Sequence, residues 1–307
     1  MRDAFVDQLT RLAKKDRNIF FITADLGFGV FDDFSTRFPD QYLNIGVAEQ
    51  NMVGVATGLA LEGRKVFTYS IANFATLRCL EQIRNDASYH DTNITVVASG
   101  GGFTYGSLGM SHHATEDIAI MRALPGVTVV SPCTAWETYH ATKALTELKG
   151  VGYLRIEKGG FQKPPKKNLN YKIGKAIEMI SGKDITIITT GGIINESLKA
   201  AKNLLAEGIS AQVVSMHTIK PIDENFIRKC AQKTKKIITV EEHNKIGGLG
   251  SAVSEVLAQN NLNCKLKVMA LDDVFSSVVG SQDFLRSHYK LDHKEIFKNT
   301  IKMLENV

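Results

Sequence analysis

A glutamate at the start of an apolar stretch is the first residue of this sequence that could do chemistry. Glu49 follows the loop 44–48 and shortly precedes a run of small and apolar residues, 52–60. A helix this apolar is expected to be buried, which places the carboxyl group of Glu49 at the edge of a core. Two roles fit: a first-turn acid stabilised by the helix dipole, or a buried carboxyl group that hydrogen-bonds or protonates a ligand heteroatom.

A long glycine-rich loop with two adjacent histidines is the second candidate. Residues 99–117 contain five glycines and end in His112, His113, Glu116 and Asp117. Glycines allow close backbone approach, and long loops inside compact domains are usually functional. We expect a histidine here to hydrogen-bond a polar substrate. We predict no metal site, because neighbouring histidines seldom point the same way and the two acids fit a helix N-terminus.

Another glycine-rich stretch, 240–252, lies between a predicted strand and a predicted helix. Its glycines could form an anion-binding nest or a tight turn that packs the helix on the strand, and we expect the turn.

The chain has no GxGxxG, Walker A or GxSxG motif. The cysteines form no CxxC pair, which argues against a disulfide framework and a thiolate zinc site, and we interpret Cys79 and Cys133 as core thiols.

Alternating helices and strands must position these loops. Buried apolar runs in the first half predict strands, and the segments between them have helical periodicity. The predicted strands are 18–23, 65–69, 94–99, 127–131 and 152–156, and the predicted helices are 3–15, 49–62, 74–89, 116–124 and 135–148. This alternation implies a parallel sheet with helices on both faces, and ligands of such sheets bind beyond the carboxyl ends of the strands.

The alternation restarts after a segment rich in lysine that contains Pro164 and Pro165. Because prolines disfavour a helix and lysines keep a segment solvated, it reads as a linker. Beyond it we predict strands 185–190, 211–215, 237–241 and 266–270, and helices 195–207, 223–233, 251–259 and 294–304. The predicted fold class is therefore α/β with two domains, each a mostly parallel sheet flanked by helices: residues 1–162, a linker 163–171, and residues 172–307.

Length, charge and composition exclude several classes of protein. The 307 residues fit two domains, and 37 Lys and Arg against 32 Asp and Glu give a net charge of +5. The basic residues form no concentrated patch with interleaved aromatics, so we expect no nucleic-acid partner, whereas sugar phosphates remain compatible. No apolar stretch is long enough for a membrane span, and acids at positions 3 and 7 are unlike a signal peptide. We therefore expect a cytoplasmic protein with no membrane partner.

Several stretches, taken in order along the chain, resemble one family. The segment 45–52 (IGVAEQNM) is similar to the signature around the catalytic glutamate of transketolases and related thiamine-diphosphate enzymes. Segments that resemble later blocks of that family follow at 70–89, 111–117 (SHHATED), 153–155 (YLR) and 240–250. The similarity spans essentially the whole chain and corresponds to the C-terminal half of a transketolase, a pyrimidine-binding domain followed by the family's C-terminal domain.

The resemblance implies a split enzyme. The N-terminal domain of the family, which holds the cofactor diphosphate and Mg²⁺ through a Gly-Asp-Gly signature, has no counterpart in these 307 residues. We therefore expect a separate N-terminal transketolase subunit that carries the diphosphate-binding domain, in an α2β2 heterotetramer with self-association. The implied cofactor is thiamine diphosphate, with Mg²⁺ or Ca²⁺ held mainly by the partner subunit.

The resemblance also implies which residues bind the cofactor. Glu49 would act as a catalytic residue by donating a hydrogen bond to N1′ of the aminopyrimidine, and burial would favour the neutral carboxyl group that this requires. Phe74, Ile71 and Arg78 would line the pyrimidine pocket, with Ile71 standing where many transketolases have an aromatic residue. Asp25 would lie near the cofactor and a subunit contact.

On the substrate side, the resemblance assigns a second catalytic residue and two further contacts. His112 would stand near the transferred group, His113 would contact the substrate, and Arg155 would bind the substrate phosphate. Two positions depart from the family pattern: Leu108 replaces an aspartate and Gly100 replaces a histidine that usually contact the donor. Loss of two polar contacts can change donor choice, so we expect a specialised sugar or a shorter donor.

The implied reaction is the transfer of a two-carbon ketol unit from a ketose or its phosphate to an aldose or its phosphate. A decarboxylating acyloin synthase of the deoxyxylulose-phosphate type and a 2-oxoacid dehydrogenase β subunit share the chemistry expected of Glu49, and both remain alternatives. A non-catalytic regulatory subunit is a third alternative, although the presence of Glu49, Phe74 and His112 argues against it.

Overall fold

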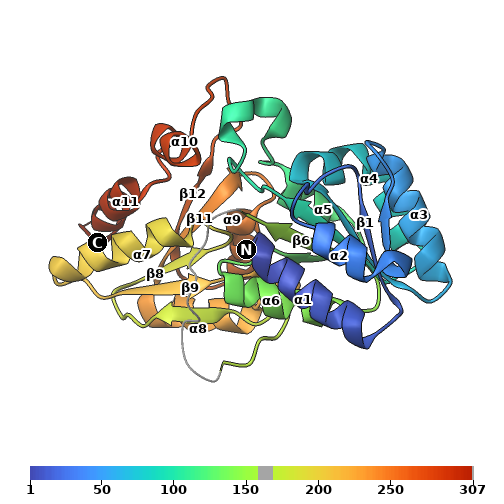
Figure 1. The fold of residues 1–307 in the computed structure, drawn as a ribbon. Helices are drawn as coiled ribbons and strands as arrows, with labels where there is room; N and C mark the ends of the chain where they lie inside the picture. Colours follow the sequence, from blue (N-terminus) through green and yellow to red (C-terminus); the bar gives the residue numbers. More distant parts are fainter. Residues whose placement is uncertain (158–168, 306–307) are drawn as a thin grey trace.

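The computed structural model describes residues 1–157 and 169–305, which form two sheets surrounded by helices (Figure 1). The predicted linker 163–171 lies outside the described residues as far as residue 168. No helix of the described ranges is long and apolar enough to cross a membrane.

The first sheet has seven strands, and they are parallel except at one edge. In spatial order they are β10 (Thr218–Lys220), β5 (Thr128–Val130), β6 (Gly152–Ile156), β4 (Ile94–Ser99), β3 (Lys65–Ile71), β1 (Ile19–Thr23) and β2 (Tyr42–Asn44). The antiparallel edge strand β10 comes from beyond the predicted linker and pairs with β5. The first sheet is therefore completed by a segment that the sequence division assigns to the second domain.

The second sheet has five strands and is parallel except for its edge strand β7. Its order is β12 (Lys265–Leu271), β11 (Lys236–Asn244), β8 (Ile185–Thr189), β9 (Ala211–Ser215) and β7 (Ile177–Ile180). The two sheets confirm the predicted α/β class, in which each domain has a mostly parallel sheet flanked by helices.

Helices cover both faces of the first sheet because its strands are apolar on both sides. Successive residues of a strand point to opposite faces, so Val66 of β3 joins one buried cluster while Phe67 joins another. The first cluster packs under α3 (Glu49–Leu61) and α5 (Asp117–Ala123), and the second packs under α1 (Arg2–Lys15) and α6 (Ala135–Leu145). The remaining helices of this part are α2 (Asp32–Arg37) and α4 (Leu80–Gln82).

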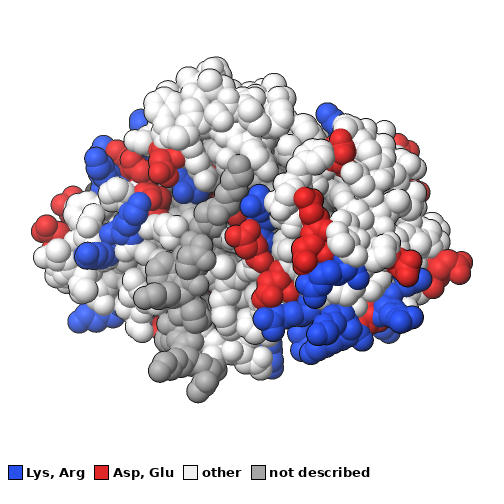
Figure 2. All heavy atoms as spheres, viewed as in Figure 1, with Lys and Arg blue, Asp and Glu red and all other residues white. Residues whose placement is uncertain are grey.

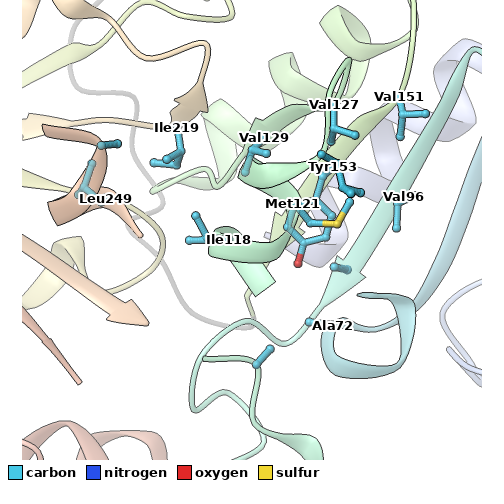
Figure 3. Close-up of a cluster of buried hydrophobic side chains, with 14 of the residues drawn as sticks. Ala72, Val96, Ile118, Met121, Val127, Val129, Val151, Tyr153, Ile219 and Leu249 are labelled. Carbon is cyan, nitrogen blue, oxygen red and sulfur yellow. The ribbon is translucent and has the colours of Figure 1, made fainter. Parts of the chain in front are cut away.

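The second part is built in the same way. Its helices are α7 (Ile194–Ala206), α8 (Glu224–Thr234), α9 (Leu249–Gln259), α10 (Gln282–His288) and α11 (His293–Glu305). Figure 3 shows that its core continues into that of the first part: Ile219 of β10 and Leu249 of α9 belong to the same buried cluster as Ile118, Met121 and Tyr153. The two domains therefore share a hydrophobic core, which fixes their relative position.

The segment 74–89, predicted as one helix, departs from a regular helix at the place where it carries candidate residues. It forms two π-helical turns, η2 (Phe74–Arg78) and η3 (Ile83–Ser88), separated by the short α4. Single π-helical turns are rare and occur frequently at functional sites, where the wider turn changes the direction of side chains. Here η2 holds both Phe74 and Arg78.

Candidate active site

Glu49 is buried at the N-terminus of α3, beyond the carboxyl end of the first sheet. The chain leaves β2 and turns at Gly46, whose φ of 74° favours glycine. It then enters α3, where Glu49 is the first residue and is only 4% exposed. Met52, Val53 and Ala56 of the same helix are fully buried, whereas Gly54, Gly58 and Leu61 are exposed, so one face of this apolar helix lies in the core and the expected burial of the whole helix does not hold.

Arg78 connects Glu49 to Phe74. Its Nη1 donates a hydrogen bond of 3.1 Å to Oε2 of Glu49. Its guanidinium carbon lies 4.1 Å from the centre of the Phe74 ring, a cation–π contact. The planar cation therefore lies between a buried carboxylate and an aromatic face, and three of the predicted cofactor residues meet at one place.

His112 also contacts Phe74. The 3-10 turn Met110–His112 carries it, and its ring centre is 5.2 Å from that of Phe74 in an edge-to-face arrangement. Asn73 holds this turn, because its side-chain amide donates a hydrogen bond of 2.6 Å to the carbonyl oxygen of Ser111. The structure thus brings Glu49, Phe74 and His112 together through contacts between segments far apart in the sequence.

His113 points away from this group into the protein. It is 3% exposed, its ring meets Phe103 edge to face, and its Nε2 lies 3.3 Å from the carbonyl oxygen of Gly106. Burial lowers its pKa, which favours the neutral imidazole. His113 also lines a cavity of about 240 Å³ together with Asn73 and Leu77, next to the turn that carries Phe74.

Asp25 and Ile71 lie at the carboxyl ends of β1 and β3. Asp25 adopts a left-handed backbone conformation with φ of 53°, and its amide donates a hydrogen bond of 3.0 Å to Oδ1 of Asn44. The amide group of Asn44 in turn donates to Oδ1 of Asp25, at 3.1 Å, and Gly46 N–H donates to Asn44 Oδ1. Asn44 therefore ties the loop of Asp25 to the turn before Glu49. Ile71 is buried at the end of β3.

Arg155 is not available to a substrate phosphate, so that prediction is wrong. Its side chain is 1% exposed. Its nitrogens donate to Asp117, Glu157 and two carbonyl oxygens, with an Nε–Oδ2 distance of 2.8 Å to Asp117. Although burial opposes its charge, the neighbouring carboxylates of Asp117 and Glu157 hold the pKa of Arg155 above its usual value. The resemblance gave Arg155 the role of a phosphate ligand, but it could not show the carboxylates that the fold packs around it.

The network around Arg155 joins the two domains and explains two of the five glycines of the loop 99–117. Arg155 donates to the backbone carbonyl of Glu242, whose carboxylate pairs with Arg286 and accepts the N–H of Phe103 at 2.5 Å. A β-carbon at position 101 would overlap the guanidinium of Arg155, and one at 102 would overlap the carboxylate of Glu242. Gly101 and Gly102 are therefore required by a buried ion network.

The glycines of the stretch 240–252 also serve the chain itself. The carboxylate of Glu241 accepts the N–H groups of Leu249 and Gly250 at 2.7 and 2.8 Å, at the N-terminus of α9. Gly248 is required here, because a β-carbon would overlap this carboxylate. The prediction of a packing turn is confirmed, since an internal glutamate occupies the position that an external anion would take.

Cys79 and Cys133 are core thiols, as predicted. All four cysteines are free, and these two are buried. Burial, with a further contribution from the nearby Glu49, raises the pKa of Cys79 to about 12. Among the described residues, no three His, Cys, Asp or Glu side chains gather in a way that could hold a metal ion.

Fold and site together define a two-domain α/β enzyme subunit with a buried glutamate beside an aromatic ring at the carboxyl edge of its first sheet. Residues 1–162 match the model of the transketolase pyrimidine-binding domain, and residues 174–296 match that of the transketolase C-terminal domain. The chain therefore belongs to the transketolase family and is a transketolase-type transferase subunit.

Known relatives align with the chain from end to end. It is 36% identical to an apulose-4-phosphate transketolase subunit of Phocaeicola vulgatus, over 99% of this chain and 97% of that one. It is also 36% identical to a 6-deoxy-6-sulfo-D-fructose transketolase subunit of Clostridium sp. (strain MSTE9), over 99% and 94%. A solved structure of a split-gene transketolase, described as an inactive β4 tetramer, superposes with a TM-score of 0.91 at 35% identity, over 99% of this chain and 98% of that one. The chain thus corresponds in extent to the C-terminal section of a split transketolase.

Proposed function

We propose that this chain is the C-terminal catalytic subunit of a split transketolase that uses thiamine diphosphate. The reaction is the transfer of a two-carbon ketol unit from a ketose or ketose phosphate to an aldose or aldose phosphate. The observation that carries the proposal is the meeting of Glu49, Arg78, Phe74 and His112 at the carboxyl edge of the first sheet. Membership of the family and the relatives named above support the same reaction.

The residues present fit an aminopyrimidine ring. Such a ring needs a hydrogen-bonding group at its edge and an apolar or aromatic surface against its face. The buried carboxyl group of Glu49 provides the first, and the ring of Phe74 with the aliphatic side chain of Ile71 provides the second. The family models that match this chain are those of the pyrimidine-binding and C-terminal domains, and we assign the diphosphate and its Mg²⁺ or Ca²⁺ to a separate N-terminal subunit.

Bound thiamine diphosphate supplies the nucleophilic carbon and the electron sink that cleavage of a ketose requires. The protein supplies position and protons. Glu49 donates a hydrogen bond from its carboxyl group to a ring nitrogen, which requires that Arg78 has moved away from that carboxyl group. Phe74 orients the ring by stacking. His112, held by the Asn73–Ser111 hydrogen bond, donates to or accepts a proton from a hydroxyl group of the substrate.

An exposed apolar surface beside the site supports assembly with other subunits. Leu77, Met110 and Phe275 are each about half exposed or more and line one cavity, and Leu108 and Val279 are also exposed. Figure 2 shows few charged side chains on the top of the molecule, over the turns of residues 106–112 and the loop before α10. Apolar patches of this kind mark interfaces. We propose an α2β2 heterotetramer, and the β4 tetramer of the solved relative supports self-association.

The substrate is a sugar or sugar phosphate whose identity the relatives do not decide. Two of them, equally similar at 36% identity, are named for apulose 4-phosphate and for 6-deoxy-6-sulfofructose. Both names describe unusual sugars, which agrees with the replacement of two donor contacts by Leu108 and Gly100. We therefore propose these two sugars, with common pentose phosphates for comparison, as the first donors to assay.

The decisive experiment tests Glu49 in the reconstituted enzyme. The chain is mixed with the N-terminal subunit from the same organism, thiamine diphosphate and Mg²⁺, and ketol transfer is measured. Glu49→Gln and Glu49→Ala are expected to lower kcat by at least about 10²-fold. Glu62→Gln, at the exposed C-terminal end of the same helix, is the matched control and should retain full activity. Equal activity of Glu49→Ala and wild type would show that the subunit is not catalytic.

Two further measurements separate the alternatives. Replacement of the ketose donor by pyruvate distinguishes a ketol transferase from a decarboxylating acyloin synthase, because only the latter releases CO₂. Calorimetric titration of thiamine diphosphate and Mg²⁺ into this chain alone is expected to give no measurable binding, whereas titration into the two-subunit complex is expected to saturate. Tight binding to the isolated chain would contradict the split site.

A further inference from the structure

The position of Arg78 indicates which group occupies the site before a ligand binds. The guanidinium makes two contacts at once: its edge donates to the carboxylate of Glu49, and its face lies 4.1 Å from the centre of the Phe74 ring. A guanidinium is planar, delocalised, and carries N–H donors along its edge. A planar nitrogen heterocycle bound by the same two residues would present its edge to Glu49 and its face to Phe74.

We propose that Arg78 is a gating residue: in the ligand-free chain its guanidinium occupies the place between Glu49 and Phe74 that an aminopyrimidine ring takes, and it must leave before the ring binds. This inference rests on the proposed function, because it concerns the same pocket. It adds that the pocket is filled by the protein itself and that ligand binding is an exchange of one planar group for another.

Burial explains why the pocket is filled. Glu49 is 4% exposed, and a carboxylate buried without a partner is strongly destabilising. Arg78 supplies the compensating charge from a side chain that is 50% exposed. Half of the Arg78 side-chain surface is therefore already in solvent, and rotation of this long side chain can carry the guanidinium out of the pocket without rearranging the core.

Charge explains why Arg78 has to leave. A cation at hydrogen-bond distance favours the ionised carboxylate, whereas the proposed role of Glu49 requires a proton on the carboxyl group. Glu49 cannot accept a hydrogen bond from Arg78 and donate one to a ligand from the same carboxyl oxygen. The Glu49–Arg78 pair is thus a closed state, and Glu49 can donate to a ligand only after the guanidinium has left.

The first test observes Arg78 directly in this chain assembled with the N-terminal subunit and kept free of thiamine diphosphate, the state that is expected to bind the ring and that both tests use. In protein labelled with ¹⁵N-arginine, the Nε–Hε signal of Arg78 is identified by its loss in Arg78→Lys. Stacking on Phe74 is expected to shift this signal upfield, and the shift should disappear in Phe74→Leu. The probe is 4-amino-5-hydroxymethyl-2-methylpyrimidine, the ring fragment of thiamine. Saturating probe should move the signal to the position of a free arginine, while the signal of Arg84 stays in place. A probe that binds and leaves the Arg78 signal unchanged would overturn the proposal.

The second test measures competition. If Arg78 fills the pocket for about nine-tenths of the time, its removal should tighten probe binding by about 10-fold. Arg78→Ala and Arg78→Gln are compared with Arg84→Ala, a matched exposed arginine on η3 whose side chain bonds Asn85 instead. Millimolar guanidinium should compete with the probe in Arg78→Ala but not in wild type.

The outcomes separate the two proposals. Tighter binding in both Arg78 variants, with Arg84→Ala unchanged, supports gating. Weaker binding in the Arg78 variants would show that Arg78 contacts the ligand instead of yielding to it, which overturns gating and leaves the proposed function intact. No binding by wild type or by any Arg78 variant would contradict the proposed function, because an emptied pocket beside Glu49 would then reject the ring. Thermal unfolding confirms that each variant is folded.

Discussion

Asn73 donates a hydrogen bond of 2.6 Å from its side-chain amide to the carbonyl oxygen of Ser111. The residue before Phe74 thereby holds the residue before His112, although the two lie 38 positions apart in the sequence. This link lies next to the edge-to-face contact of Phe74 and His112, whose ring centres are 5.2 Å apart. The π-helical turn and the glycine-rich loop consequently form one unit rather than two independent loops.

Asn73→Ala should therefore act through the position of His112. Loss of the hydrogen bond frees the 3-10 turn of residues 110–112, and we expect kcat of the reconstituted enzyme to fall about 10-fold, since misplacement by an ångström can cost up to 10²-fold. The free energy of unfolding should fall by only about 1 kcal/mol. Asn85→Ala, an exposed asparagine on η3, is the control. An unchanged kcat in Asn73→Ala would show that His112 does not depend on this link.

Arg155→Met tests the buried ion network. The change leaves the carboxylates of Asp117 and Glu157 buried without their main cation, so we expect the free energy of unfolding in urea to fall by about 3–5 kcal/mol. Arg155→Lys should recover part of this loss, because one ammonium cannot make all the hydrogen bonds of the guanidinium. A phosphate ligand would behave differently: KM for a phosphorylated donor would rise while stability stayed the same.

Long elements were predictable and short ones were not. Strands β4, β6 and β9 begin and end at the predicted residues, because strands buried on both faces are continuous apolar runs. The prediction missed the short strands β2, β7 and β10, since three or four residues show no periodicity. The position of β10 in the first sheet could not be predicted either, because pairing with β5 joins residues on opposite sides of the linker.

The candidate site was predictable where a motif lies in one continuous segment. Glu49, Phe74 and His112 stand in three such segments, and the fold brings them together. Asn44 and Asn73 were missed, although each stands close to a predicted residue. The sequence around a single asparagine does not indicate which carbonyl or carboxylate group its side chain will hydrogen-bond. Arg155 was misassigned for the same reason. Its contact to Glu242 comes from the other domain, 87 positions away.

Glu137 should make stability depend on pH. It is fully buried at the start of α6, and burial raises its pKa from 4.5 to about 7. Because the folded state binds the proton more tightly than the unfolded state, this contribution is complete below pH 4.5 and is lost as pH rises through about 7. Relative to wild type, Glu137→Gln should therefore gain about 1–3 kcal/mol of stability between pH 4 and pH 8.

Urea unfolding of wild type and Glu137→Gln at a series of pH values measures this difference. The amide keeps an oxygen that can accept the N–H of Cys133, which the carboxylate accepts at 2.6 Å. Glu147→Gln, an exposed glutamate just beyond the same helix, is the control and should show no such trend. A difference between Glu137→Gln and wild type that stays constant with pH would mean that Glu137 has the same proton affinity in both states.

Donor choice should depend on Gly100 and Leu108, the two positions that depart from the family pattern. The structure gives these two residues different surroundings. Gly100 has a φ of 89°, and a β-carbon there would overlap the ring of Tyr105, so a histidine cannot simply be restored. Leu108 is different, because its side chain is 54% exposed on a 3-10 turn and can be replaced without disturbing the core. It is therefore the position at which specificity can be tested without loss of folding.

Leu108→Asp should raise kcat/KM for a common pentose phosphate donor by about 10-fold relative to the donor that wild type prefers, because a new polar group can pair with a substrate hydroxyl. Competition between the two donors in one reaction measures this ratio directly. Leu205→Asp, an exposed leucine on α7 of the other domain, controls for added charge and should leave the ratio unchanged. An unchanged ratio in Leu108→Asp would mean that residue 108 does not face the donor, and the specialised substrate would then have to be explained by the space that Tyr105 fills beside Gly100.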